Sequence, residues 1–184
     1  MRGSARATRK PCTVRARIAP EVSGPAWPTA CYALAMAIFK RILVATDFGD
    51  ASERALGVAL ELAARFESEL TLIHVWEFPT YEYLDGVPMP IDYADRVGEA
   101  ASARMAATID SIKARCPNAK SIVKMGVVAS EVLRSVEETK PDLLVVGTHG
   151  RRGFKRAILG SVAEKLVRSS PVPVLTVHGA EKAA

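Results

Sequence analysis

The stretch that decides the fold is "DLLVVGTHGRRGFKRAILGSVAEKLVRSSPVPVLTV", residues 142–177. It begins with a short, nearly continuous apolar run at 142–147 and passes through a basic loop that contains glycines. A helix-like segment at 160–170 and a second apolar run at 172–177 follow. A short apolar run bounded by turn residues is typical of a strand covered on both faces. A strand, a helix and a strand in this order predict a parallel pair joined by a right-handed crossover.

The same alternation of strand and helix patterns fills the sequence upstream. Further strands are predicted at 41–46, 69–75 and 120–126, and further helices at about 50–66, 93–115 and 129–139. Asp50 with Glu53 three residues later predicts a capping box at the first helix start. Charges within 120–126, and Pro173 in the last strand, favour positions at the edges of a sheet. Five strands and four helices in strict alternation predict a single α/β domain, with a doubly wound parallel sheet and helices on both faces.

The formal net charge of +5 comes from the N-terminal part of the chain. Residues 1–35 are rich in arginine and interrupted by prolines, so we expect a disordered basic tail. An upstream start codon, with Met36 as the natural first residue, is one interpretation of this tail, and a transit peptide is another. Acidic and basic side chains balance in residues 36–184, so the charge gives no support for nucleic-acid binding. No apolar run is long enough to span a bilayer, and we expect no membrane partner.

The loop "GTHGRRGFKRAILGS", residues 147–161, follows a central-looking strand and ends where a helix begins. In a parallel sheet, ligands bind beyond the carboxyl ends of the strands. Glycines let backbone N–H groups approach an anion, and a helix start directs free N–H groups at the same point. The loop therefore favours phosphate binding, although a basic loop in contact only with solvent is an equally open interpretation. A dinucleotide-binding fingerprint and a P-loop are both excluded, because neither glycine spacing is present.

With the glycines, the element order and the position of the loop together, the sequence resembles the universal stress protein family over residues 38–178. "RILVATDFGDASERAL" is similar to the first strand and helix of that family, and the stretch 142–177 is similar to its closing third. The spacing G-x2-G-x9-G-[ST], present here as Gly147, Gly150, Gly160 and Ser161, is the pattern of its ATP-binding branch. The resemblance implies a sheet order of 3-2-1-4-5.

The resemblance also implies which residues would contact ATP, with Mg²⁺ as a possible companion ion. Asp47 would contact the nucleoside, with capping of the following helix as the alternative role. The remaining residues fall into three groups: Ala45 and Val75 beside the adenine; Val146, Gly147, His149 and Gly150 along the ribose and phosphates; and Gly160, Ser161, Val162 and Ala163 around the phosphate tail. Ala163 stands where a second hydroxyl residue is common, so one donor is expected to be missing. We predict no metal cluster, and interpret His74 as a packed strand histidine.

We expect a regulatory, ATP-binding module for stress adaptation and not a dedicated enzyme, since no catalytic arrangement of side chains is evident. Two alternatives stay open: a nucleotide-free protein-interaction module, and a protein that hydrolyses ATP slowly at Asp47. An edge strand invites pairing with its own copy, so we predict a homodimer through residues 172–177. With Cys116 as the only cysteine in residues 36–184, the composition is compatible with a reducing cytoplasm.

Overall fold

The computed structural model of the chain describes residues 39–77, 92–148 and 159–179, in which strands and helices alternate as predicted. The strands are β1 (Arg41–Ala45), β2 (Glu69–Trp76), β3 (Lys120–Met125), β4 (Leu143–Gly147) and β5 (Val174–Val177). The helices are α2 (Asp50–Phe66), α3 (Tyr93–Ile112), α4 (Val128–Thr139) and α5 (Ser161–Ser169). The N-terminal tail lies outside the described residues. None of the described helices is both long and apolar enough to cross a membrane.

The five strands form one parallel sheet in the order β3-β2-β1-β4-β5, which confirms the predicted order. The chain winds from β1 outward to β3, then crosses β1 and winds in the opposite direction through β4 to β5. Asp142 joins β1 to β4 at their amino ends, because one carboxylate oxygen accepts the backbone N–H groups of Lys40 and Arg41, each at 2.8 Å. Because β2 and β3 lie on one side of β1, and β4 and β5 on the other, the winding direction of the chain reverses between β1 and β4.

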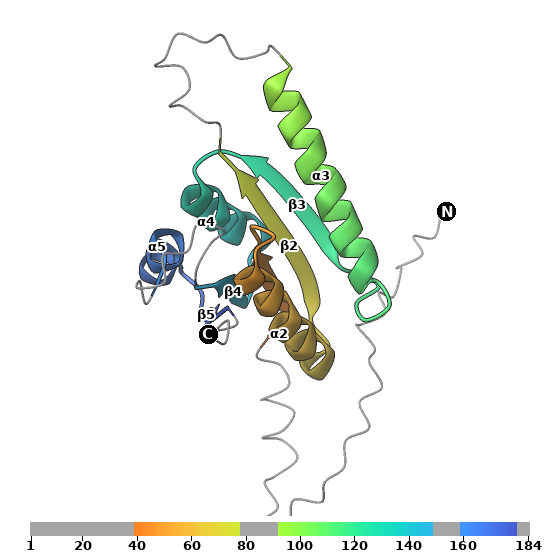
Figure 1. Cartoon of the computed structure of the whole chain (residues 1–184). Coiled ribbons are helices and arrows are strands. Elements are labelled where there is room, and N and C mark those ends of the chain that lie inside the picture. The colour runs from red at the N-terminus through yellow and green to blue at the C-terminus, as the bar shows by residue number, and fades with distance from the viewer. Residues whose placement is uncertain (1–38, 78–91, 149–158, 180–184) are drawn as a thin grey trace, which may run out of the picture.

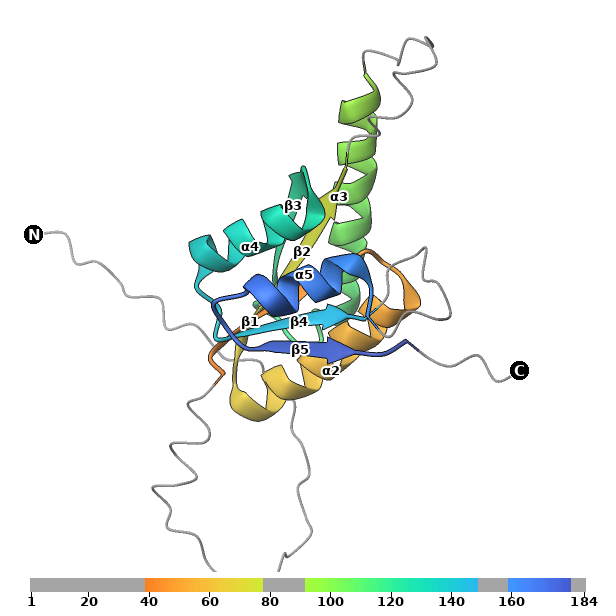
Figure 2. The same ribbon diagram turned by 90° about the vertical axis from the view of Figure 1, so that its left-hand side faces the viewer.

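Helices cover both faces of the sheet (Figures 1 and 2). α2 and α3 pack on one face, where apolar side chains of β1 and β2 such as Val44 and Leu72 are completely buried. α4 and α5 pack on the other face, around Leu43, Ile73 and Leu144. Because successive strand residues point to opposite faces, strands buried on both sides need apolar residues at nearly every position, and that is the pattern of β1 and β4.

Both predicted edge strands lie at the edges, β3 at one side and β5 at the other. One detail of the prediction is wrong: Pro173 precedes β5 and is not part of it. Its carbonyl still accepts the N–H of Leu144 at 3.0 Å. Proline lacks only the N–H donor, so it can extend the pairing at the start of the strand without leaving a bond unmade.

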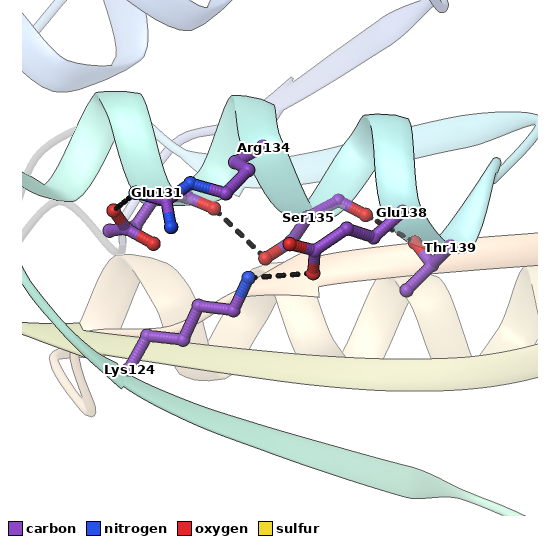
Figure 3. Close-up of polar contacts among 6 residues, drawn as sticks. All are labelled: Lys124, Glu131, Arg134, Ser135, Glu138 and Thr139. Atoms are coloured by element: carbon purple, nitrogen blue, oxygen red, sulfur yellow. Dashed lines mark hydrogen bonds and ion pairs between the residues drawn. The ribbon is translucent and has the colours of Figure 1, made fainter.

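Polar contacts fix α4 over the sheet (Figure 3). Lys124 of β3 forms an ion pair with Glu138 of α4 at 2.7 Å. Glu131, which is buried, pairs with Arg134 one turn later, and the Ser135 hydroxyl donates to the Glu131 carbonyl at 2.9 Å. The pair of Lys124 with Glu138 thus ties α4 to β3, whereas the other two contacts lie within α4 and support the helix itself.

Candidate functional site

The carboxyl ends of β1 and β4 lie side by side. Ala45 of β1 is paired with Val146 of β4 in the strand register. Asp47, which follows β1, and Thr148, which follows β4, therefore lie at the same carboxyl edge of the sheet. This is the point of winding reversal, where parallel α/β sheets bind their ligands. α2, α4 and α5 all begin at this edge, because each follows the carboxyl end of a strand.

After β1 the chain makes a tight turn through Thr46, Asp47, Phe48 and Gly49. The Thr46 hydroxyl accepts the N–H of Phe48 at 3.0 Å, and an Asp47 carboxylate oxygen accepts the N–H of Gly49 at 3.0 Å. Asp47 is half-buried in this arrangement. Its side chain therefore supports the turn directly before α2, whatever else it contacts.

The predicted capping box of α2 is wrong in its residues. The helix cap is Gly49, not Asp50, and the residue three positions later is Ser52. The Ser52 hydroxyl accepts the N–H of Gly49 at 3.0 Å and donates to the Gly49 carbonyl at 2.9 Å. It also lies 3.2 Å from the Thr46 hydroxyl, so the cap and the turn form one hydrogen-bond network. Glu53 is exposed, and it takes part through its backbone N–H, which donates to the Gly49 carbonyl at 2.9 Å.

Ala45 and Val75, predicted to lie beside the adenine, and Val146, predicted to line the ribose and phosphates, share the α4 and α5 face of the sheet. The structure thus brings together residues of three different strands. Val75 is 7% exposed and Val146 is 3% exposed, so both side chains belong mainly to the core. Ala45 is half-buried and packs against the same cluster.

Gly147 is required by the packing of α2. A Cβ atom built on Gly147 would stand 2.9 Å from the backbone carbonyl carbon of Ala51 and 2.9 Å from the backbone N of Ser52. Real Cβ atoms do not approach backbone atoms so closely. The physical reason for this glycine is therefore the close passage of the first turn of α2 over the end of β4, and not only access for an anion.

Thr148 and Gly160 join the two ends of the glycine loop. The Gly160 N–H donates to the Thr148 carbonyl at 2.7 Å, and the Thr148 N–H donates to the Val177 carbonyl at 2.9 Å. Thr148 is 1% exposed. Gly160 is thus held against the end of β4, and its N–H is already bonded to a backbone carbonyl of the protein.

α5 begins at this carboxyl edge of the sheet, beside the end of β4. Gly160 is its cap residue, with no side-chain cap, and the first i to i−4 bond is from the Glu164 N–H to the Gly160 carbonyl at 2.8 Å. The N–H groups of Ser161, Val162 and Ala163 precede that bond and have no acceptor within the helix. Ser161 and Val162 are exposed, whereas the Ala163 side chain is 4% exposed and packs on the sheet. Backbone donors, the Ser161 hydroxyl and the positive end of the helix dipole can together attract an anion here.

His149 and Gly150 lie outside the described residues, as do the four basic side chains of the loop. Among the described residues there is no group of three His, Cys, Asp or Glu side chains that could hold a metal ion. His74 is half-buried in β2, and its Nδ1 lies 2.8 Å from the Thr46 carbonyl.

The model of the universal stress protein family matches residues 38–178 of this chain. The chain belongs to the universal stress protein family. Universal stress protein MJ0531 of Methanocaldococcus jannaschii is 30% identical to it over 149 residues, which is 79% of this chain and 85% of the relative. The fold of this universal stress protein is also similar to the solved structure of MJ0577 from the same organism, with a TM-score of 0.64 at 24% identity, over 79% of this chain and 99% of the other.

A second solved structure bears on the site. A universal stress protein in complex with cAMP is 26% identical to this chain, with a TM-score of 0.52, over 78% of this chain and 99% of the other. That structure holds a nucleotide on the same fold.

Sequence reasoning missed three buried hydroxyl residues that lie at the carboxyl edge of the sheet, beside the ends of β1 and β4. Thr46, Ser52 and Thr148 are all buried and all hydrogen-bonded at the ends of β1 and β4. A buried hydroxyl needs a partner, so a threonine that directly follows an apolar strand is a signal that could have found two of them. Thr46 and Ser52 bond each other and the backbone of residues 48 and 49, all within six positions. The Thr148 hydroxyl instead lies 3.2 Å from Nδ1 of His178, a partner that spacing does not reveal.

Proposed function

We propose that this universal stress protein binds an adenine nucleotide, ATP in the first place, at the carboxyl edge between β1 and β4. We further propose that it acts in the cytoplasm as a regulatory module in stress adaptation and not as a dedicated catalyst. The observation that carries the proposal is the start of α5 at the point of winding reversal, in a chain with the spacing G-x2-G-x9-G-[ST]. The relative with bound cAMP supports the same class of ligand.

The free amides at the start of α5 are the proposed phosphate contacts. The N–H groups of Ser161 and Val162 stand at the exposed end of the helix, together with the Ser161 hydroxyl. Gly160 contributes in another way: its N–H is bonded to Thr148, so it serves to place the helix start against β4. Ala163 adds a backbone donor, while its side chain packs on the sheet.

Asp47, in the turn between β1 and α2, is the proposed nucleoside contact. Ala45 and Val75 border the same face of the sheet, and the exposed part of Ala45 is the proposed apolar support for the base. Magnesium in nucleotide sites is commonly held by phosphates together with one or two carboxylates. In the alternative of slow ATP hydrolysis, Asp47 would instead face the phosphates and supply that carboxylate.

Calorimetric titration of the full chain with ATP, ADP, AMP and cAMP tests the proposal. Ser161→Ala removes one exposed hydroxyl donor and should weaken ATP binding by about ten- to a hundredfold, the effect of one hydrogen bond to a charged group. Val167→Ala, further along α5 on an exposed position, is the matched control and should bind as the wild type does. No binding of any of the four nucleotides by the wild type would refute the proposal.

Asp47 can be tested for its two roles separately. Asp47→Asn keeps an oxygen that accepts the Gly49 N–H, so the turn is preserved while the charge is removed. Asp47→Ala removes both. If the carboxylate contacts the nucleoside, both variants weaken ATP binding. If only the alanine variant loses affinity, Asp47 acts through the turn alone.

A homodimer is the second part of the proposal. β5 is an edge strand, and in the described part of the chain β4 is its single strand neighbour. An edge strand presents backbone donors and acceptors to a partner. We propose that a second copy pairs along β5, and sedimentation at micromolar concentration measures this directly. A nucleotide-free interaction module would show the same dimer with no response to ATP.

A further inference from the structure

The turn that carries Asp47 has an unfavourable backbone conformation. Phe48 has a φ of +60°, in the left-handed region. This region is uncommon for any residue other than glycine and is an outlier for a bulky side chain. Such conformations persist only where surrounding contacts determine them, and they concentrate at functional sites.

Two elements hold the Phe48 side chain. Its ring contacts the imidazole of His74, with 4.4 Å between the ring centroids. On the ring also lies the guanidinium of Arg104, at 4.5 Å from the centroid. Arg104 comes from α3 and His74 from β2, so three separate parts of the chain meet in one stack of side chains.

The same two residues also bond the backbone on either side of Asp47. His74 Nδ1 lies 2.8 Å from the Thr46 carbonyl. Because a carbonyl oxygen only accepts, Nδ1 carries the hydrogen and donates it. Arg104 donates to the Phe48 carbonyl at 3.2 Å. The carbonyl before Asp47 and the carbonyl after it are thus each fixed by a side chain from another element.

We propose that Arg104 and His74 are positioning residues of the nucleotide site. They hold Phe48 in its left-handed conformation, and so they set the direction in which Asp47 faces the edge between β1 and β4. This inference rests on the proposed nucleotide binding. Neither residue is assigned a contact with the nucleotide: the observed bonds of Arg104 and of His74 Nδ1 are to backbone carbonyls of the turn.

Two arginine variants on α3 test Arg104. Arg104→Ala removes both the ring contact and the hydrogen bond, and Arg104→Lys keeps the charge but loses the flat guanidinium that lies on the ring. We expect both to weaken ATP binding by about three- to tenfold, the effect of a single contact of this kind. Arg96→Ala removes the same charge from an exposed position of the same helix and should leave the dissociation constant unchanged.

Two variants separate the ring of His74 from its donor. His74→Phe keeps an aromatic ring beside Phe48 and loses the donor, so ATP affinity should fall. His74→Asn carries an amide nitrogen at the same number of bonds from the backbone as Nδ1, and should restore part of the affinity.

Calorimetry with ATP and thermal unfolding without nucleotide are measured on the full chain for every variant. Loss of affinity in Arg104→Ala and His74→Phe, with Arg96→Ala unchanged, supports the inference. Wild-type affinity in both, whether or not their unfolding midpoints shift, overturns it and leaves the proposed function standing. A wild type that binds no nucleotide overturns both.

Discussion

Replacing Gly147 by alanine tests the packing at the edge between β4 and α2. The added Cβ would stand 2.9 Å from the carbonyl carbon of Ala51 and from the backbone N of Ser52, and 3.0 Å from the Ala51 Cβ. These distances are about half an ångström or more below the optimal separation of roughly 3.5 Å for nonbonded atoms. The neighbours are backbone atoms of a helix, which cannot rotate away as a side chain would. Either α2 or the end of β4 must move.

The expected loss of stability is that of an overpacked core position, about 1–3 kcal/mol. For a chain of this size, each 1 kcal/mol lowers the unfolding midpoint by about 2–4 °C. A loss of about 2 kcal/mol therefore corresponds to a decrease of about 4–8 °C. Gly147→Val would exceed this, because its two further methyl groups extend into the same space.

The assay is thermal and urea unfolding of the full chain without nucleotide. Gly179→Ala is the matched control, since its Cβ would approach the same residue, Ala51, at an ordinary contact distance of 3.5 Å. We expect that control to remain within about 0.5 kcal/mol of the wild type, as is usual for substitutions that disturb no packing. If Gly147→Ala unfolds at the wild-type midpoint, the close approach of α2 is not the reason for this glycine and the reasoning is refuted.

Variants at three other positions probe separate parts of the fold. Gly57→Ala, within α2 and with nothing within 4 Å of the added Cβ, should stabilise the protein by about 0.5–1 kcal/mol in urea unfolding, and a lower stability would contradict the open space seen there. Asp142→Ala should lose about 0.5–1.5 kcal/mol, because the exposed N–H groups of Lys40 and Arg41 exchange their acceptor for water. Asp142→Asn keeps an oxygen and should lose less, so equal losses would count against this account. The carbonyls of Pro173 and Val177 face β4, so by alternation along the strand the N–H of Thr176 faces away from β4. Thr176→Pro removes that N–H and should give a monomer in sedimentation without unfolding the chain. A dimer that persists in this variant would place the interface elsewhere.

The element order and the sheet order could be predicted because they depend on local patterns. Apolar runs of four to six residues separated by helical periodicity determine strict alternation, and a parallel sheet follows from it. Charged Lys120 and Lys124 in β3 indicated an edge strand, and β3 lies at the edge. The resemblance to a family then gave the strand order, which no local pattern encodes.

The helix start after β1 could not be predicted, because its cap depends on a turn. Asp50 and Glu53 have the spacing of a capping box, but the left-handed Phe48 shifts the cap to Gly49 and makes Ser52 its partner. Arg104 and His74, which contact the Phe48 ring and bond the carbonyls of Thr46 and Phe48, come from distant elements. A local pattern contains no information about such contacts.

The packing role of Gly147 could not be predicted from the sequence for the same reason. In the sequence it is one of several glycines in a basic loop, and access for phosphate explains them all equally well. In the structure the first turn of α2 passes over it, a contact between residues nearly a hundred positions apart. A glycine at a ligand-binding edge can thus be required by packing alone, and only a structure distinguishes the two reasons.

A crystal structure of the full chain with ATP tests the central claim most directly. This account predicts phosphate oxygens within hydrogen-bond distance of the Ser161 and Val162 amides, with the nucleoside beside Asp47 at the edge between β1 and β4. A nucleotide bound at any other place on the molecule, or an edge filled by the protein's own side chains at saturating ATP, would contradict it.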